Sequence, residues 1–371
     1  MAHPKDFSLG ISGFKFSDLY SPTRLKDLHE EFWKFADKAS PPLRQRFAGL
    51  DAPVITPPVE AEVLIETSRL VGDFIGKLFN VTTHTAAIKT ATQDLSIIFR
   101  FKREFLNTRV FKRLTESPCA EADYKELADK VHKIASAEPK TSQDEEINFS
   151  RLVMFFVTAE AMVKKNALTP VENQKVQLLC SAFHTNDNTE KIESALKLFE
   201  EYCVQTYVHP ERRKKFQGWQ SFVRPNKLDF EHLVHTESPE SKLPELFQGP
   251  TEHLRHRVGF KLTDPRMTQK EYLREVDYCI YCHARQKDSC AKGFPEKTGG
   301  FKKNPLGIEL EGCPLDERIS EMHLLRNEGE VIGSLAMIML DNPMCPGTGH
   351  RICNDCMKGC IFQKQEPVNI P

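Results

Sequence analysis

The sequence predicts an all-α protein with two parts, a helical N-terminal region and a small helical region rich in cysteine. Three observations lead to this prediction. Apolar residues recur at spacings of three and four through most of the chain, the alternation typical of strands is scarce, and short helical patterns also separate the cysteines of the last quarter. We therefore expect helices throughout, with eight of the eleven cysteines gathered near the C-terminus.

The composition is that of an ordinary globular protein of 371 residues, long enough for more than one hydrophobic core. Its 51 basic and 52 acidic side chains nearly cancel, which excludes the basic footprint of a nucleic-acid-binding protein. The most apolar window, residues 331–340, is about half of the roughly 20 residues that a membrane span requires. The N-terminus lacks the basic stretch and apolar run of a signal peptide. We therefore expect a cytoplasmic protein that enters no membrane.

The first region, residues 1–225, is expected to consist of consecutive helices. Ser21 followed by Pro22 is typical of a helix start, and apolar residues then recur every three or four positions. Further helices are expected at residues 59–80, 84–114, 121–136, 144–166, 170–185 and 189–215. No pattern of catalytic or metal-binding residues occurs in this region, so its role stays open.

A change in composition marks the end of the first region. Prolines recur between residues 226 and 267 and break any long periodic pattern. Such a segment indicates a linker, or an extended arm that lies on a neighbouring surface. We therefore place the boundary between the two regions here.

The second region, residues 268–371, carries its cysteines between short helices. It opens with a capping-box pattern at Thr268 and Glu271, which predicts a helix over residues 268–283. Two more helical patterns, at 316–326 and 330–340, are separated by a glycine. The cysteines are thus expected near helix ends.

Eight cysteines lie in this region, in two runs. The first run is Cys279, Cys282, Cys290 and Cys313, and the second is Cys345, Cys353, Cys356 and Cys360. Because thiols stay reduced in the cytoplasm, a dense cluster is more often metal-binding or catalytic than disulfide-bonded. The other three cysteines lie singly among helical patterns, where packed and unreactive side chains are expected.

The spacing and number of these cysteines favour iron-sulfur clusters. A structural zinc site usually takes two close cysteine pairs about 15 to 20 residues apart, whereas Cys279-x2-Cys282 and Cys353-x2-Cys356 are about 70 residues apart. Tight C-x2-C and C-x3-C steps, with one thiolate for each iron, suit 4Fe-4S clusters. Two other metal or thiol chemistries stay open, a helical scaffold with structural zinc and a pair of redox thiols.

An enzyme with a cysteine nucleophile is a further alternative. Such a nucleophile needs a histidine partner, and His283 and His350 lie in or beside the cysteine runs. A histidine in this position is more often one that supports metal ligands or is merely exposed. We therefore assign no catalytic residue.

The motifs of the second region also resemble those of a known family. The matching segments are Tyr278-Cys-Ile-Tyr-Cys282, Cys290, Gly312-Cys-Pro314, Thr348-Gly-His-Arg-Ile-Cys353, and Cys356, Cys360 and Pro367-Val-Asn-Ile370. They are similar to the N-terminal iron-sulfur domain of glutamate synthase small subunits and dihydropyrimidine dehydrogenases, over about residues 270 to 371. The resemblance implies a helical domain with two 4Fe-4S clusters that passes electrons between a flavin and a distant acceptor.

The same resemblance implies how the cysteines are shared between the two clusters. By the family pattern, the first cluster is held by Cys279, Cys282, Cys290 and Cys360. The second is held by Cys313, Cys353 and Cys356, with a Gln or Glu of the next helix as fourth ligand. Cys345, which the family pattern does not require, is a candidate for the eighth ligand.

Two features depart from the family pattern. The span between Cys290 and Cys313 is much longer than in the family and is partly filled by the basic, glycine-containing residues 291–303. The helix expected to carry the fourth ligand of the second cluster would begin where the sequence reaches Pro371. Both features leave the ligand assignment to be tested.

The resemblance places the clusters beside an FAD domain and an NAD(P)H domain. No G-x-G-x-x-G motif follows a strand pattern in this sequence, so neither cofactor is expected on this chain. We therefore expect an electron-transfer module, or a truncated subunit, of an FAD/NAD(P)H-dependent oxidoreductase. Its partner would be a flavoprotein domain or subunit.

Overall fold

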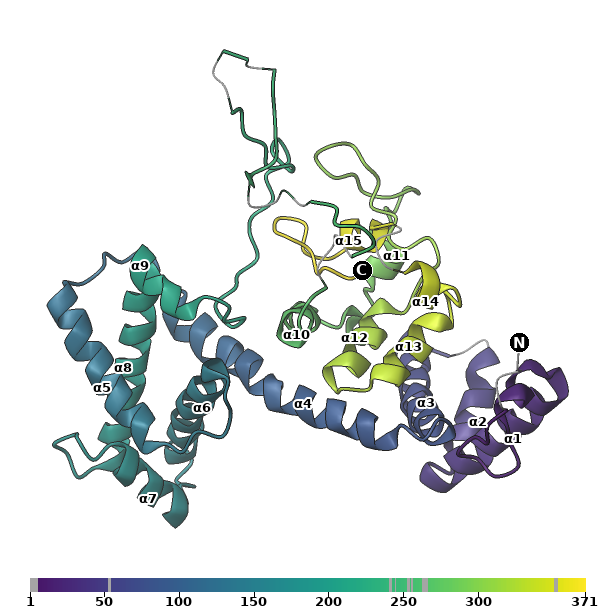
Figure 1. Cartoon of the computed structure of the whole chain (residues 1–371), viewed down its shortest axis with the longest axis horizontal. Coiled ribbons are helices and arrows are strands. Elements are labelled where there is room, and N and C mark those ends of the chain that lie inside the picture. Colours follow the sequence, from purple (N-terminus) through teal and green to yellow (C-terminus); the bar gives the residue numbers. More distant parts are fainter. Residues whose placement is uncertain are drawn as a thin grey trace. The chain divides into compact units, whose positions relative to one another are not determined.

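The computed structural model describes residues 6–52, 55–239, 242–243, 245–251, 254, 256–261, 266–349 and 353–371 (Figure 1). The predicted all-α fold is confirmed. The described residues form helices joined by turns and loops, and the only β-type pairings among them are isolated bridges. None of the described helices is both long and apolar enough to cross a bilayer.

Contacts divide the chain into two compact units. The first comprises residues 1–90 and 225–371, and the second comprises residues 91–224. One border between the units therefore falls at residues 224–225 and another at residues 90–91. The first ninety residues, however, group with the cysteine region, whereas the sequence-based division placed them in one region with residues 91–225.

The first unit contains helices from both ends of the chain. Its N-terminal helices are η1 (Phe16–Tyr20), α1 (Pro22–Ala39), α2 (Leu43–Ala48), η2 (Gly49–Asp51), α3 (Pro57–Leu78) and the start of α4 (Thr82–Phe101). Its C-terminal helices are α10 (Gln269–Tyr278), η6 (Cys282–Arg285), α11 (Ser289–Lys292), α12 (Ile319–Asn327), α13 (Val331–Met339), α14 (Cys345–Thr348) and α15 (Asp355–Lys358). The predicted starts are confirmed, because Ser21 caps α1 and Thr268 and Glu271 form the capping box of α10.

The second unit surrounds an aromatic core. Besides the end of α4, its helices are the π-helix η3 (Lys102–Val110), α5 (Glu121–Ala137), α6 (Glu145–Val163), α7 (Pro170–Leu179), α8 (Asn188–Val208), α9 (Pro210–Arg213) and η4 (Lys214–Phe216). Phe105, Phe156 and Phe199 are completely buried in this core. The carboxylate of Glu146 is buried with them and accepts hydrogen bonds from the backbone N–H and the hydroxyl of Ser221, both at 2.8 Å.

Helices α3 and α13 of the first unit cross so closely that only glycine fits at the contact. A Cβ added to Gly333 would lie 2.7 Å from the carbonyl oxygen of Ser68. A Cβ added to Gly72 would lie 3.0 Å from the backbone nitrogen of Gly333. The two helices therefore touch through their backbones.

Apolar and ionic contacts extend this crossing. Leu64 and Ile65 of α3 form a buried cluster with Leu325 of α12 and Met337 of α13. The surrounding ion pairs are Arg69 with Glu328, Lys89 with Glu330, and Arg318 with Glu60. Each pair joins the N-terminal segment to the segment that carries the cysteines. Residues 57–90 thus support the helices beside the cysteine region.

Gly333→Ala is expected to destabilise the first unit by about 1–3 kcal/mol, because the added methyl group forces α3 and α13 apart. Chemical denaturation followed by circular dichroism measures this change in the free energy of unfolding. Gly49→Ala is the control, since nothing lies within 4 Å of its Cβ position and its φ of −81° suits any residue. Equal free energies of unfolding for wild type and Gly333→Ala would contradict the close crossing.

Candidate metal centre

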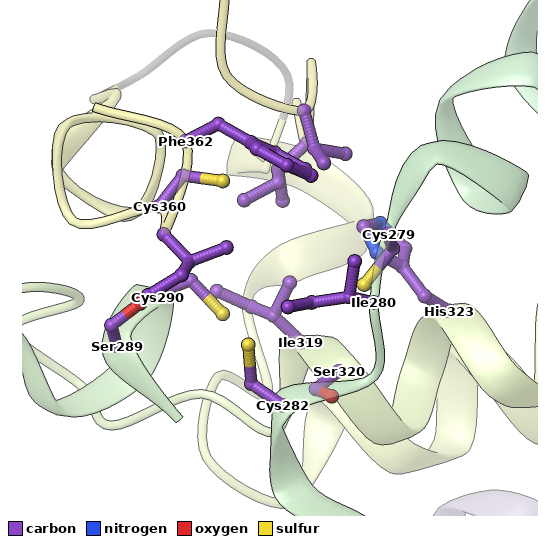
Figure 2. A pocket seen from close by; sticks show the side chains of 13 residues that line it. Cys279, Ile280, Cys282, Ser289, Cys290, Ile319, Ser320, His323, Cys360 and Phe362 are labelled. Atoms are coloured by element: carbon purple, nitrogen blue, oxygen red, sulfur yellow. The ribbon is translucent and has the colours of Figure 1, made fainter. Parts of the chain in front are cut away.

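Four cysteines from separate segments line one cavity of the first unit. The lining residues are Cys279, Ile280, Cys282, Ser289, Cys290, Ile319, Ser320, His323, Cys360, Ile361, Phe362, Val368 and Ile370. Figure 2 shows the sulfur atoms of the four cysteines around a common space. Three of these cysteines are buried and Cys279 is half-buried. The structure thus brings together the four residues that the family resemblance groups in the first cluster.

The cavity is small, and its thiols do not converge on a single point. Its volume is about 20 Å³, which is the room of one or two water molecules. Within the described parts of the chain, no group of three His, Cys, Asp or Glu residues is placed to hold a single metal ion. The four thiols therefore surround a shared space without forming a ready-made site for one ion.

An aromatic stack joins the first and last cysteines of the cavity. Tyr278, at the end of α10, and Phe362 stack with their ring centroids 4.3 Å apart and an angle of 4° between the rings. The Tyr278 hydroxyl also donates a hydrogen bond to the carbonyl oxygen of Glu366 at 3.0 Å. Because Tyr278 precedes Cys279 and Phe362 follows Cys360 closely, this stack brings the two cysteine-bearing segments together.

Three cysteine-bearing segments also meet through their backbones. A Cβ added to Gly312 would lie 2.4 Å from the backbone nitrogen of Gly293, and one added to Gly359 would lie 2.9 Å from the Cα of Gly312. The N–H of Cys313 donates to the carbonyl oxygen of Cys290 at 2.9 Å. Gly312 has a φ of 83°, which favours glycine as well. A side chain at Gly312 or Gly359 would push these segments apart.

The long span between Cys290 and Cys313 folds back on itself. The N–H of Phe294 donates to the carbonyl oxygen of Leu310, and the N–H of Leu310 donates to that of Lys302, both at 2.9 Å. The two ends of the span are therefore paired with each other. Its length does not separate the two cysteines, whose backbones are hydrogen-bonded.

A second group of cysteines lies beside the first. Cys313 and Cys356 are buried in an apolar cluster that includes Cys290, and Cys345 packs against this cluster. Cys353 is exposed. Burial raises the pKa of Cys356 to about 12, and negative charge on the neighbouring Cys313 and Cys353 adds to the shift. The three residues expected at the second cluster are thus neighbours, and Cys345 packs against the apolar cluster that contains two of them.

Burial raises the pKa of three thiols around the cavity, those of Cys279, Cys282 and Cys290. It raises the pKa of Cys279 to about 12. It raises the pKa of Cys290 further, helped by the nearby Asp288, whose carboxylate accepts a hydrogen bond from the Cys290 thiol at 3.1 Å. These thiols are therefore protonated at neutral pH unless a cation is present, and metal binding has to displace their protons.

Three polar residues near the cavity were not singled out by the sequence. His323 Nδ1, Ser289 Oγ and Glu321 Oε2 are buried and have no hydrogen-bond partner among the described residues. His323 and Ser289 line the cavity, whereas Glu321 lies on the same helix as His323. A single His or Glu inside a helical pattern gives no signal in a sequence, so only burial distinguishes these residues.

The two histidines that the sequence did indicate are placed differently. The Nδ1 atom of His283 lies 2.6 Å from the hydroxyl of Ser320 on α12, so this ring is engaged by a serine. His350 lies outside the described residues. The contact of His283 is thus with a serine and not with a cysteine.

The carboxyl group of Glu321 is expected to make stability depend on pH. Burial, with a contribution from Asp288, raises its pKa from 4.5 to about 7. The folded state thus binds this proton more tightly than the unfolded state, so the free energy of unfolding falls as the pH rises from about 4.5 to about 7. Above pH 7, wild type is expected to have lost about 2–3 kcal/mol of its free energy of unfolding in this way. Glu321→Gln should not show this loss, because its side chain carries no titrating proton.

Urea unfolding at about pH 4.5 and pH 8 measures this difference between wild type and Glu321→Gln. The control is Glu62→Gln, because the side chain of Glu62 is 75% exposed and should leave the pH dependence unchanged. If the free energy of unfolding falls equally in wild type and Glu321→Gln between the two pH values, Glu321 is not the group that causes the pH dependence.

Comparison with known proteins finds two relatives, both from Rickettsia prowazekii (strain Madrid E). Uncharacterized protein RP005 is 23% identical over 313 residues, which cover 82% of this chain and 94% of that protein. Uncharacterized protein RP006 is 75% identical over 28 residues, which cover 8% of this chain and 4% of that protein. No protein-family model matches the chain, and no solved structure matches it either.

Proposed function

We propose that the cysteine region binds two 4Fe-4S clusters and passes electrons between a flavoprotein partner and a further acceptor. The observation that carries this proposal is the single cavity shared by Cys279, Cys282, Cys290 and Cys360. One thiolate for each iron is the ligand set of a 4Fe-4S cluster. When bound, such a cluster supplies one-electron chemistry at a potential set by its ligands and surroundings.

The rest of the cavity suits this role. Its other walls are mostly apolar, with side chains such as Ile280, Ile319 and Val368. Apolar walls limit the access of water, which is one of the factors that set the potential of an iron-sulfur site. The cavity is small and burial raises the pKa of Cys279, Cys282 and Cys290. We therefore infer that the lining residues move apart and that these thiols lose protons on loading.

For the second cluster we propose Cys313, Cys353 and Cys356 as ligands, with Cys345 as the fourth. The packing of Cys345 against the buried cluster of Cys313 and Cys356 supports this choice. The carboxylate of Glu317 is also near, since its charge contributes to the raised pKa of Cys345 after burial. Cys345 is favoured as the ligand because thiolates are the usual ligands of such clusters.

FAD and NAD(P)H belong to a partner domain or subunit in this proposal. A reducing compartment such as the cytoplasm, where thiols stay reduced, is part of this proposal.

Anaerobic purification followed by metal and sulfide analysis tests the proposal. We expect a brown protein with about eight irons and eight acid-labile sulfides per chain, and an EPR signal on reduction. The same preparation exposed to an iron chelator should lose colour and circular-dichroism signal from the first unit. Colourless protein that contains zinc and no sulfide would overturn the proposal in favour of a zinc scaffold.

The sharing of cysteines between the two clusters gives a second prediction. Cys360→Ser is expected to damage the cluster held by Cys279, Cys282 and Cys290, while Cys356→Ser damages the other. Since each serine variant removes a thiolate from one cluster only, the two should abolish different EPR signals. Cys119→Ser is the control, because Cys119 belongs to the second unit. Loss of the same signal in both variants would show that the interleaved assignment is wrong.

A further inference from the structure

His323 is a buried histidine that faces the same cavity as the four cysteines. It lies on α12, is only 4% exposed, and lines the cavity together with Cys279, Cys282, Cys290 and Cys360. Figure 2 shows its ring at the side of the cavity where Cys279 lies. Its Nδ1 atom has no hydrogen-bond partner among the described residues. Such a buried polar atom is costly when it stays unpaired.

The chemistry of the ring limits what its partner can be. Burial lowers the pKa of His323 to about 4, so the ring is neutral at neutral pH and offers one N–H donor and one acceptor nitrogen. Apart from two serines, the other side chains that line the cavity are cysteines and apolar residues. One of the serines, Ser320, is already engaged with His283. The other, Ser289, lies beside Cys290, on the side of the cavity away from His323 (Figure 2). The side-chain acceptors on the His323 side of the cavity are therefore sulfur atoms.

We propose that His323 donates a ring N–H hydrogen bond to a sulfur of the iron-sulfur cluster held in this cavity, and so raises its reduction potential. This inference rests on the proposed function. Hydrogen bonds to the sulfurs stabilise the more negatively charged reduced state, and they are among the factors that set cluster potentials. The four thiols already supply one ligand for each iron, so His323 acts beside the ligands as a positioning and tuning residue.

The test compares the reduction potential of three forms of the whole chain, all loaded with iron and sulfide. His323→Phe removes the donor and keeps an aromatic ring in place, whereas His323→Gln keeps an N–H donor. At the potential where the wild-type cluster is half reduced, the Phe variant should show a ratio of reduced to oxidised cluster that is lower by about fivefold, the effect of one hydrogen bond. The Gln variant should recover at least part of the difference.

EPR-monitored redox titration gives the potentials, and iron and sulfide analysis gives the loading of each form. His29→Phe is the matched control, because His29 lies in the same unit but accepts its hydrogen bond from Trp33, outside the cavity. Should His323→Phe fail to fold, His323→Leu carries the same comparison with a smaller side chain.

The outcomes separate this inference from the proposed function. Wild-type protein without iron and sulfide overturns the function itself. Loaded wild type with an unchanged potential in His323→Phe overturns the hydrogen bond alone. Loss of iron in every His323 variant, with none recovered in His323→Gln, also overturns it, because His323 would then be a ligand. A lowered potential with full loading and recovery by Gln supports the inference.

Discussion

The backbone contact at Gly312 is the constraint on which the cysteine region depends. Gly312 touches Gly293 on one side and Gly359 on the other, at distances that exclude a side chain. These glycines lie beside Cys290, Cys313 and Cys360, so three segments that are distant in sequence are brought to one place. The hydrogen bond between Cys313 and Cys290 then makes the two cysteine groups immediate neighbours. The residues proposed as ligands of the two clusters are therefore adjacent along this hydrogen bond.

The N-terminal helices contribute to this region from outside. The crossing at Gly72 and Gly333 fixes α13 on α3, and α13 packs on α12, which carries His323. The first ninety residues are therefore linked to the cavity by the packing of two helices, α13 and α12. This connection gives those residues a part in the site although they contain no cysteine.

Local features of the fold were predictable and long-range packing was not. The starts of α1 and α10 follow from residues within one helical turn, at Ser21 and Thr268, so the sequence alone indicates them. Cysteine spacing likewise identified the region of the candidate site, and the ligand assignment stays a prediction. The pairing of Gly72 with Gly333 leaves no periodic signal, because each glycine is ordinary within its own helix. The burial of His323 depends on neighbours from other segments and was missed for the same reason.

The folded-back span between Cys290 and Cys313 affects how such proteins can diverge. Its ends pair with each other before they reach the cysteines, and between them the span makes two turns, at residues 296–300 and 304–308. We therefore expect that residues can be added or removed at these turns without moving either thiol. The number of residues between the two cysteines could then vary between related sequences while the three-dimensional arrangement is kept. We expect relatives with the same arrangement to keep the glycines flanking the cysteines more strictly than the length of this gap.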